Sequence, residues 1–193
     1  PNEQAVQYYE MNAKYDYGTP QYPIFDSVYI QLEEVECEEG IRTNSKDGKE
    51  SYSAKTRLTP AIVEILLSAY FNAVDAVDKN KDSIKKSDFV KESAHMIFTF
   101  PIYGGIDKIS KKPIPGQSSN AYFKVHPYGD KKTNFTALDK KSIDIEDLKG
   151  VYFKYIPILC IDKIYIGVKI SIQMRISSAV VTEIKENKFQ EHN

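Results

Sequence analysis

The sequence predicts a mainly-β protein, either a barrel or a sandwich, with one long α-helix inserted among its strands. Several segments alternate apolar and polar residues, which is typical of strands with one buried face. The clearest is KISIQMRISSAVV at residues 169–181. One segment, after Pro60, instead repeats apolar residues at the helical spacing of three to four positions. The chain has 193 residues, 41% of them apolar, which is enough for one domain with a substantial core.

The first part of the chain is predicted to form an arm followed by two strands. Residues 1–23 are polar and rich in tyrosine, and we expect an arm or loop there. Residues 24–37 predict the first strand, and residues 52–58 predict the second. Between them stands Asp47-Gly48, a dipeptide typical of tight turns, so the two strands are expected to form a hairpin.

The helix is predicted to begin at Pro60, because Thr59 is a favourable N-cap and proline is favoured at the first helical position. Its apolar stripe continues to Val77, a length of about five turns. Glu64 and Asp75 lie on the opposite, acidic side, which is unsuited to contact with phosphates.

Strands are expected to resume in the second half of the chain. The predicted strands are residues 96–103, 120–128, 151–167 and 168–184. A loop rich in glycine, proline and lysine separates the first two, and residues 142–150 are expected to form a helical turn that ends at Gly150. Residues 185–193 are expected to form a tail.

Charge is unevenly distributed along the chain. The net charge is −1, so the protein as a whole carries no excess of positive charge. Residues 26–50 nevertheless contain eight acidic and three basic residues, whereas residues 103–141 contain eight lysines and three aspartates. This asymmetry predicts a locally basic surface on a neutral protein.

No metal site is expected. The residues that follow the helix resemble the start of a calcium loop, with Asp78, Asn80 and Asp82 at its first, third and fifth positions. An EF-hand loop also requires glycine at the sixth position and glutamate at the twelfth, where this chain has Ser83 and Phe89. The three histidines lie far apart, and neither cysteine is near one of them, so no spacing typical of zinc ligands occurs.

Enzyme motifs are also missing from the sequence. It contains no nucleophile elbow and no phosphate-binding loop, so we expect no enzymatic activity and no cofactor. Cys37 and Cys160 both lie in strand-like segments, which favours free thiols and a reducing, intracellular compartment over a disulfide scaffold. No secretory signal or sufficiently long apolar run predicts contact with a membrane.

Tyrosines alternate with basic residues in several of the predicted strands. Stacked aromatic rings combined with cations are typical of grooves for single-stranded nucleic acid. The ordinary alternative is that tyrosine suits strands and lysine suits sheet edges. The residues that fit a groove on this pattern are Tyr122, Lys124, Lys131, Lys132, Tyr152, Lys154, Tyr165 and Lys169, and the outward side of the last strand adds Gln173 and Arg175.

The segment GVYFKYIPILCIDKIYIGVKISIQMRISSAVVTEI, residues 150–184, resembles the C-terminal block of the single-stranded DNA-binding proteins of large nucleo-cytoplasmic DNA viruses. Those proteins are similar in turn to the single-stranded DNA-binding protein of short-tailed bacteriophages. YIQLEEVE, residues 29–36, is a weaker match to the first strand of the family. The resemblance implies one OB-fold-like barrel over residues 1–193, with an inserted helix.

The resemblance also implies a function. It implies sequence-independent binding of single-stranded DNA in a basic, aromatic-lined cleft, during viral DNA replication, recombination or repair. Within the matching block the implied site residues are Tyr152, Lys154, Tyr165, Lys169 and Arg175. Replication proteins and further copies of the chain are additional candidate partners, and the host cytoplasm, viral factory or nucleus are the candidate locations. The alternative is a virion structural protein with a β-sandwich fold.

Overall fold

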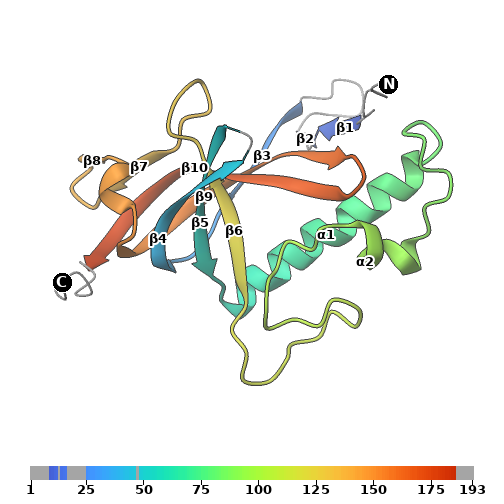
Figure 1. The fold of residues 1–193 in the computed structure, drawn as a ribbon, viewed down its shortest axis with the longest axis horizontal. Helices are drawn as coiled ribbons and strands as arrows, with labels where there is room; N and C mark the ends of the chain where they lie inside the picture. Colours follow the sequence, from blue (N-terminus) through green and yellow to red (C-terminus); the bar gives the residue numbers. More distant parts are fainter. Residues whose placement is uncertain (1–8, 13, 17–24, 47, 186–193) are drawn as a thin grey trace.

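The computed structural model describes residues 9–12, 14–16, 25–46 and 48–185 (Figure 1). Its centre is a closed barrel of five strands, in which each strand pairs with the next and β10 pairs back with β9. This closure confirms the predicted barrel and excludes the sandwich. In order around the barrel the strands are β9 (Tyr152–Ile166), β4 (Val35–Lys46), β5 (Lys49–Arg57), β6 (Asn120–Val125) and β10 (Ile170–Lys185).

The remaining strands extend the barrel wall at both ends of the sheet. Strand β9 is long enough to pair in succession with β4, with β3 (Phe25–Gln31) and with β1 (Tyr9–Asn12) along one edge. Strand β2 (Lys14–Asp16) pairs with β3. On the other side, β10 pairs with β7 (Asn134–Ala137), which pairs with β8 (Ser142–Ile143).

Helix α1 (Pro60–Asn80) begins where the sequence predicted, and the hydroxyl oxygen of Thr59 accepts a hydrogen bond from the backbone N–H of Ile62 at 3.4 Å. Figure 1 shows it running diagonally below the strands, from near the end of β5 toward the side where β9 and β10 meet in their turn. Its apolar stripe is buried in the core, and Tyr70 packs edge-to-face on Phe98 and Phe100. The buried residues of the stripe are Ile62, Val63, Leu66, Tyr70, Ala73, Val74 and Val77.

The same helix is long and apolar enough to cross a membrane by length and composition, which corrects the expectation that no apolar run is long enough to do so. Seven of its apolar residues, however, are buried in the core, and Phe71 is the large apolar side chain of the helix that stays exposed. The other side carries Glu64 and Asp75, both exposed, and Asp75 pairs with Lys91 at 2.7 Å. The arrangement is that of an amphipathic helix covering a protein core.

Two predicted strands need correction. The predicted strand at residues 24–37 is interrupted, and its described residues belong to two strands, β3 and β4. Between them the backbone N–H of Leu32 donates a hydrogen bond to the carbonyl of Pro157, and the chain then pairs with β9 again as β4. Residues 96–103 contain no strand: they follow η1 (Lys91–Ser93), begin in α2 (Ala94–Ile97) and continue as an extended segment with isolated bridges at Phe98 and Tyr103. Its alternate residues Phe98, Phe100 and Ile102 are buried in the core, where Phe98 and Phe100 pack on Tyr70 of α1.

Several smaller predictions are also settled. The hairpin around Gly48 is confirmed, although its strands are longer than predicted, and the strand from residue 120 ends at Val125. The helical turn within 142–150 is present as η2 (Glu146–Leu148), and Gly150 has a positive φ of 66°. The predicted arm contains β1 and β2; its other residues, and the tail beyond residue 185, lie outside the described residues.

Candidate nucleic-acid interface

One row of side chains crosses the outer face of the barrel. Residues directly opposite each other on neighbouring strands share a face of the sheet. Lys124 of β6 lies between Phe123 and Val125, which are buried in the core, so Lys124 and its cross-strand partners point outward. From β4 to β3 the row contains Arg42, Ser53, Lys124, Arg175, Cys160 and Tyr29.

Arg175 faces outward, as the alternation predicted, but it is only 7% exposed. Its Nε lies 3.2 Å from Oδ2 of Asp162, and Nζ of Lys131 lies 3.3 Å from Oδ1 of the same carboxylate. Asp162 occupies an irregular position in β9, where the register with β10 shifts. Arg175 is therefore an outward-facing residue whose guanidinium is covered by its ion pair with Asp162, which Lys131 shares.

Positive charge exceeds negative charge around Asp162. We define the basic cluster as Lys124, His126, Lys131, Lys163 and Arg175. Burial, reinforced by Lys163 and Lys131, outweighs Asp162 and lowers the pKa of Lys124. Burial, with Arg175 and Lys124, likewise lowers the pKa of His126.

The pKa of Asp162 is lowered as well, which in a carboxyl group favours the charged form. Although burial opposes its ionisation, Arg175 and Lys131 hold its pKa below the ordinary value. One carboxylate thus stands among Lys124, Lys131, Lys163 and Arg175, and this excess of cationic side chains favours a bound anion.

The cluster continues across β10 and β9. Lys124 donates a hydrogen bond from Nζ to the side-chain oxygen of Gln173. Gln173 lies opposite Lys163, and Ser171 lies opposite Tyr165, so these side chains extend the same outer face. Tyr165 is half-buried, with its ring against Gly167, on the side of the strand that the alternation assigned to it.

Exposed tyrosines flank the basic cluster on two sides. Tyr128 is 75% exposed in the loop between β6 and β7, the same loop that carries Lys131 and Lys132. Two residues before Lys124, Tyr122 packs edge-to-face on Tyr103 with 5.1 Å between ring centroids, and both rings are partly exposed. Such rings are platforms on which bases of any identity can stack.

The structure does not bring all of the predicted residues together. Tyr152 and Lys154 lie on β9 at least nine residues before Lys163, roughly 30 Å away along the strand. Lys154 pairs there with Glu183 at 3.3 Å, and Nζ of Lys185 lies 5.0 Å from the centre of the Tyr152 ring. These two residues form a separate surface in which an acidic partner already balances the lysine.

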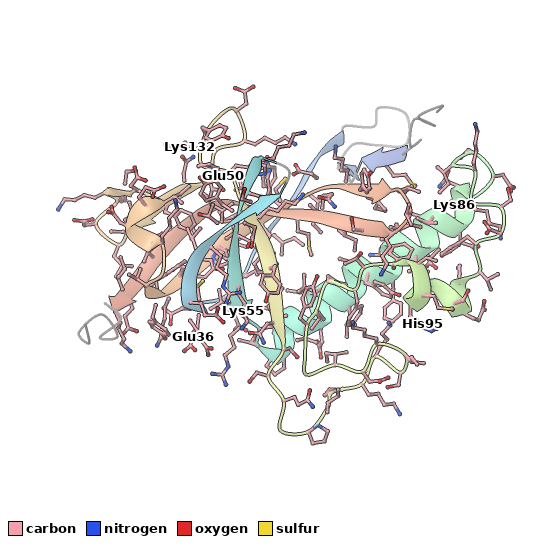
Figure 2. All side chains as sticks on the ribbon, in the orientation of Figure 1. Glu36, Glu50, Lys55, Lys86, His95 and Lys132 are labelled. Atoms are coloured by element: carbon pink, nitrogen blue, oxygen red, sulfur yellow. The ribbon has the colours of Figure 1, made fainter. Side chains whose placement is uncertain are left out.

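The other predicted lysines lie nearer to the cluster. Lys132 is exposed beside Lys131 in the β6–β7 loop (Figure 2). Lys169 is exposed in the turn between β9 and β10, four residues from Gln173 and therefore about 13 Å along the strand. Both therefore extend the positively charged surface beyond the basic cluster.

The predicted site left out residues that the structure places at its centre. Lys163, His126 and Tyr128 were part of the basic and aromatic pattern but were not selected. Lys163 could have been found, since it shares the outward side of its strand with Tyr165. Asp162 gives no such signal, because its contact with Arg175 depends on the irregular pairing of β9 with β10.

Metal binding has no support in the described part of the chain, where no three His, Cys, Asp or Glu side chains gather into a group that could hold an ion. In the segment that resembles a calcium loop, Asp78 pairs with Lys81 and Lys91 at 3.2 and 3.7 Å. Phe89, at the position of the EF-hand glutamate, is buried in the core.

The fold is similar to that of gp2.5, a single-stranded DNA binding protein encoded by bacteriophage T7, whose crystal structure superposes with a TM-score of 0.52. The similarity covers 86% of this chain and 92% of the phage protein, at 12% sequence identity, and it therefore concerns the fold alone. No curated protein sequence matches this chain. Residues 38–191 match the family described as "Protein of unknown function (DUF2738)", and the chain belongs to that family.

Proposed function

We propose that this protein binds single-stranded DNA, without reading its sequence, across the outer face of strands β5, β6, β10 and β9. The observation that carries the proposal is the excess of cations around Lys124, with Tyr128 on one side and Tyr122 on the other. A barrel of the same fold belongs to a phage protein that is a single-stranded DNA binding protein, which supports the same use of this one.

The division of roles follows from residue chemistry. Lys124, Lys163 and the two loop lysines would contact phosphates, because they are mobile positive charges on one surface. Tyr128 and Tyr122 would stack on bases, which a duplex keeps paired and stacked and therefore cannot offer. Stacking accepts every base, so this site would tolerate any sequence.

The biological setting is part of the same proposal. We place the activity in the replication, recombination or repair of viral DNA, in an intracellular compartment and without chemistry on the DNA. The resemblance of residues 150–184 to the proteins of large DNA viruses supports this setting, and so does the fold shared with the phage protein.

The direct test is fluorescence anisotropy with labelled oligo(dT) and with duplex DNA of the same length. We expect clear preference for the single strand and an affinity that falls as salt rises. Contacts with three or four phosphates give a slope of about −2 to −3 in log K against log salt, at ~0.7 per contact on single strands. Equal affinity for the duplex, or no dependence on salt, would contradict the proposal.

Removal of one ring should act differently from removal of a charge. Tyr128→Ala is expected to weaken binding to oligo(dT) by roughly 1–3 kcal/mol, which is the stacking contribution of one base, and to leave the salt slope unchanged. The same anisotropy titration measures both quantities. Tyr152→Ala is the matched control, since Tyr152 lies at the other end of β9, and it should retain wild-type affinity.

A further inference from the structure

A pocket of about 190 Å³ opens beside the basic cluster, where β5 and the chain after β6 separate beyond the Tyr52–Val125 pair. The pocket lies between the β4–β5 hairpin and the β6–β7 loop. Its lining includes Glu50, Tyr52, Lys124, His126 and Tyr128. The pocket is smaller than the roughly 300–1,000 Å³ of sites for drug-sized ligands. A single planar ring is the kind of group that fits it.

Glu50 gives this pocket a directional hydrogen-bond acceptor. The hydroxyl of Tyr52 donates to Oε2 of Glu50 at 2.8 Å and so orients the carboxylate (Figure 2 labels Glu50). A carboxylate has about four lone-pair sites and no donor, so it can accept further hydrogen bonds while the tyrosine is bound. Glu50 therefore accepts hydrogen bonds from a ligand and repels ligand groups that are themselves acceptors.

The surroundings of Glu50 suit a nucleotide. Nζ of Lys149 lies 4.9 Å from the centre of the Tyr52 ring, and Lys124 and His126 line the opposite wall. Lys124 offsets the negative charge of Glu50 near a DNA strand, whereas Lys149 is already paired with Glu146 at 2.7 Å. Tyr128, at the rim, presents an open ring face on which a base can stack.

We propose that this pocket receives one base of the bound strand and prefers a base that presents an amino group, so that cytosine is favoured over thymine. The inference rests on the proposed binding of single-stranded DNA, and it adds a modest preference at one position to binding that accepts every base. Cytosine offers its N4 amino group to the carboxylate of Glu50, whereas thymine presents the O4 acceptor at the same position. The two bases have similar size and stacking, so the carboxylate decides between them.

The experiment compares oligo(dC) with oligo(dT) of about 12 nucleotides, within the range of one OB-fold site, by anisotropy at low salt and pH 8. A homopolymer places the same base in the pocket in every register, and cytosine is unprotonated at this pH. The wild-type protein should bind oligo(dC) about 3- to 10-fold more tightly, because a single hydrogen bond to a base edge discriminates less than the bidentate pairs that are worth roughly 5- to 150-fold. Glu50→Gln, whose amide both donates and accepts, should abolish this preference without weakening binding to oligo(dT).

Glu64→Gln, an equal charge change on the exposed side of α1, is the control and should keep the preference. Thermal melting of each variant establishes that the fold is retained. Equal binding of both oligonucleotides by the wild-type protein would overturn the base preference and leave the proposed function standing. A preference that persists in Glu50→Gln would also overturn the inference. Binding to neither oligonucleotide would instead refute the proposed function, and the inference with it.

Discussion

The double variant Lys124→Gln, Lys163→Gln is expected to bind single-stranded DNA about 10- to 30-fold more weakly than the wild-type protein at low salt, a loss of ~1.4–2 kcal/mol. Both lysines lie on the outer face of the barrel, around the centre of the basic cluster. Two lost phosphate contacts should also reduce the salt slope by about 1.4, because each single-strand contact contributes ~0.7. Anisotropy titrations at several salt concentrations measure both effects.

The control must separate local contact from net charge. Lys79→Gln, Lys86→Gln removes the same two charges from the end of α1 and the turn after it, on a different part of the molecule. It should lower affinity by less than about 3-fold and preserve the salt slope, because only screened, long-range attraction is lost. If the two double variants behave alike, the basic cluster is not where DNA binds.

Leu66→Ala is expected to destabilise the protein by roughly 2–5 kcal/mol. Leu66 lies in the middle of the apolar side of α1, is 1% exposed and belongs to the main core. Truncation would leave a cavity beneath a helix that is held on the barrel by its apolar stripe. Chemical denaturation should show a lower midpoint with an unchanged m-value.

The comparison for Leu66 is the neighbouring exposed side of the same helix. Ser68→Ala changes an exposed side chain on α1 and should alter the free energy of unfolding by no more than about 0.5 kcal/mol. Similar losses in the two variants would mean that α1 does not pack in the orientation described here.

Local patterns were sufficient for much of the secondary structure. Helix α1 was predicted from Thr59 onward because its cap, its proline and its periodic stripe are all encoded within a few residues of one another. The long strands β9 and β10 were predicted for the same reason, since alternation records which face of a strand is buried. Residues 96–103 were misassigned because the buried Phe98, Phe100 and Ile102 alternate with more exposed residues as in a strand, whereas the segment forms only isolated bridges.

The composition of the candidate site was also accessible from the sequence. Lysines and tyrosines alternate at 122–124 and again at 163–165, and the local charge asymmetry predicted a basic surface on a neutral protein. The outward side of β10 was predicted as well, since Gln173 and Arg175 do share a face with Lys124 across the sheet. These are properties of residues two positions apart, which the strand geometry places on one side.

What only the tertiary structure decided is which outward residues meet. Lys124 and Arg175 are neighbours because β6 and β10 pair across a separation of about 50 residues, and no local period encodes that register. The same long-range pairing places the cluster next to the later part of β9. Tyr152 and Lys154, at the start of that strand, therefore lie apart from it. Arg175 faces outward yet is buried, because Asp162 and the β6–β7 loop close over it. Alternation determines the side of a strand on which a residue lies; exposure and neighbours depend on the other strands and loops that fold onto that side.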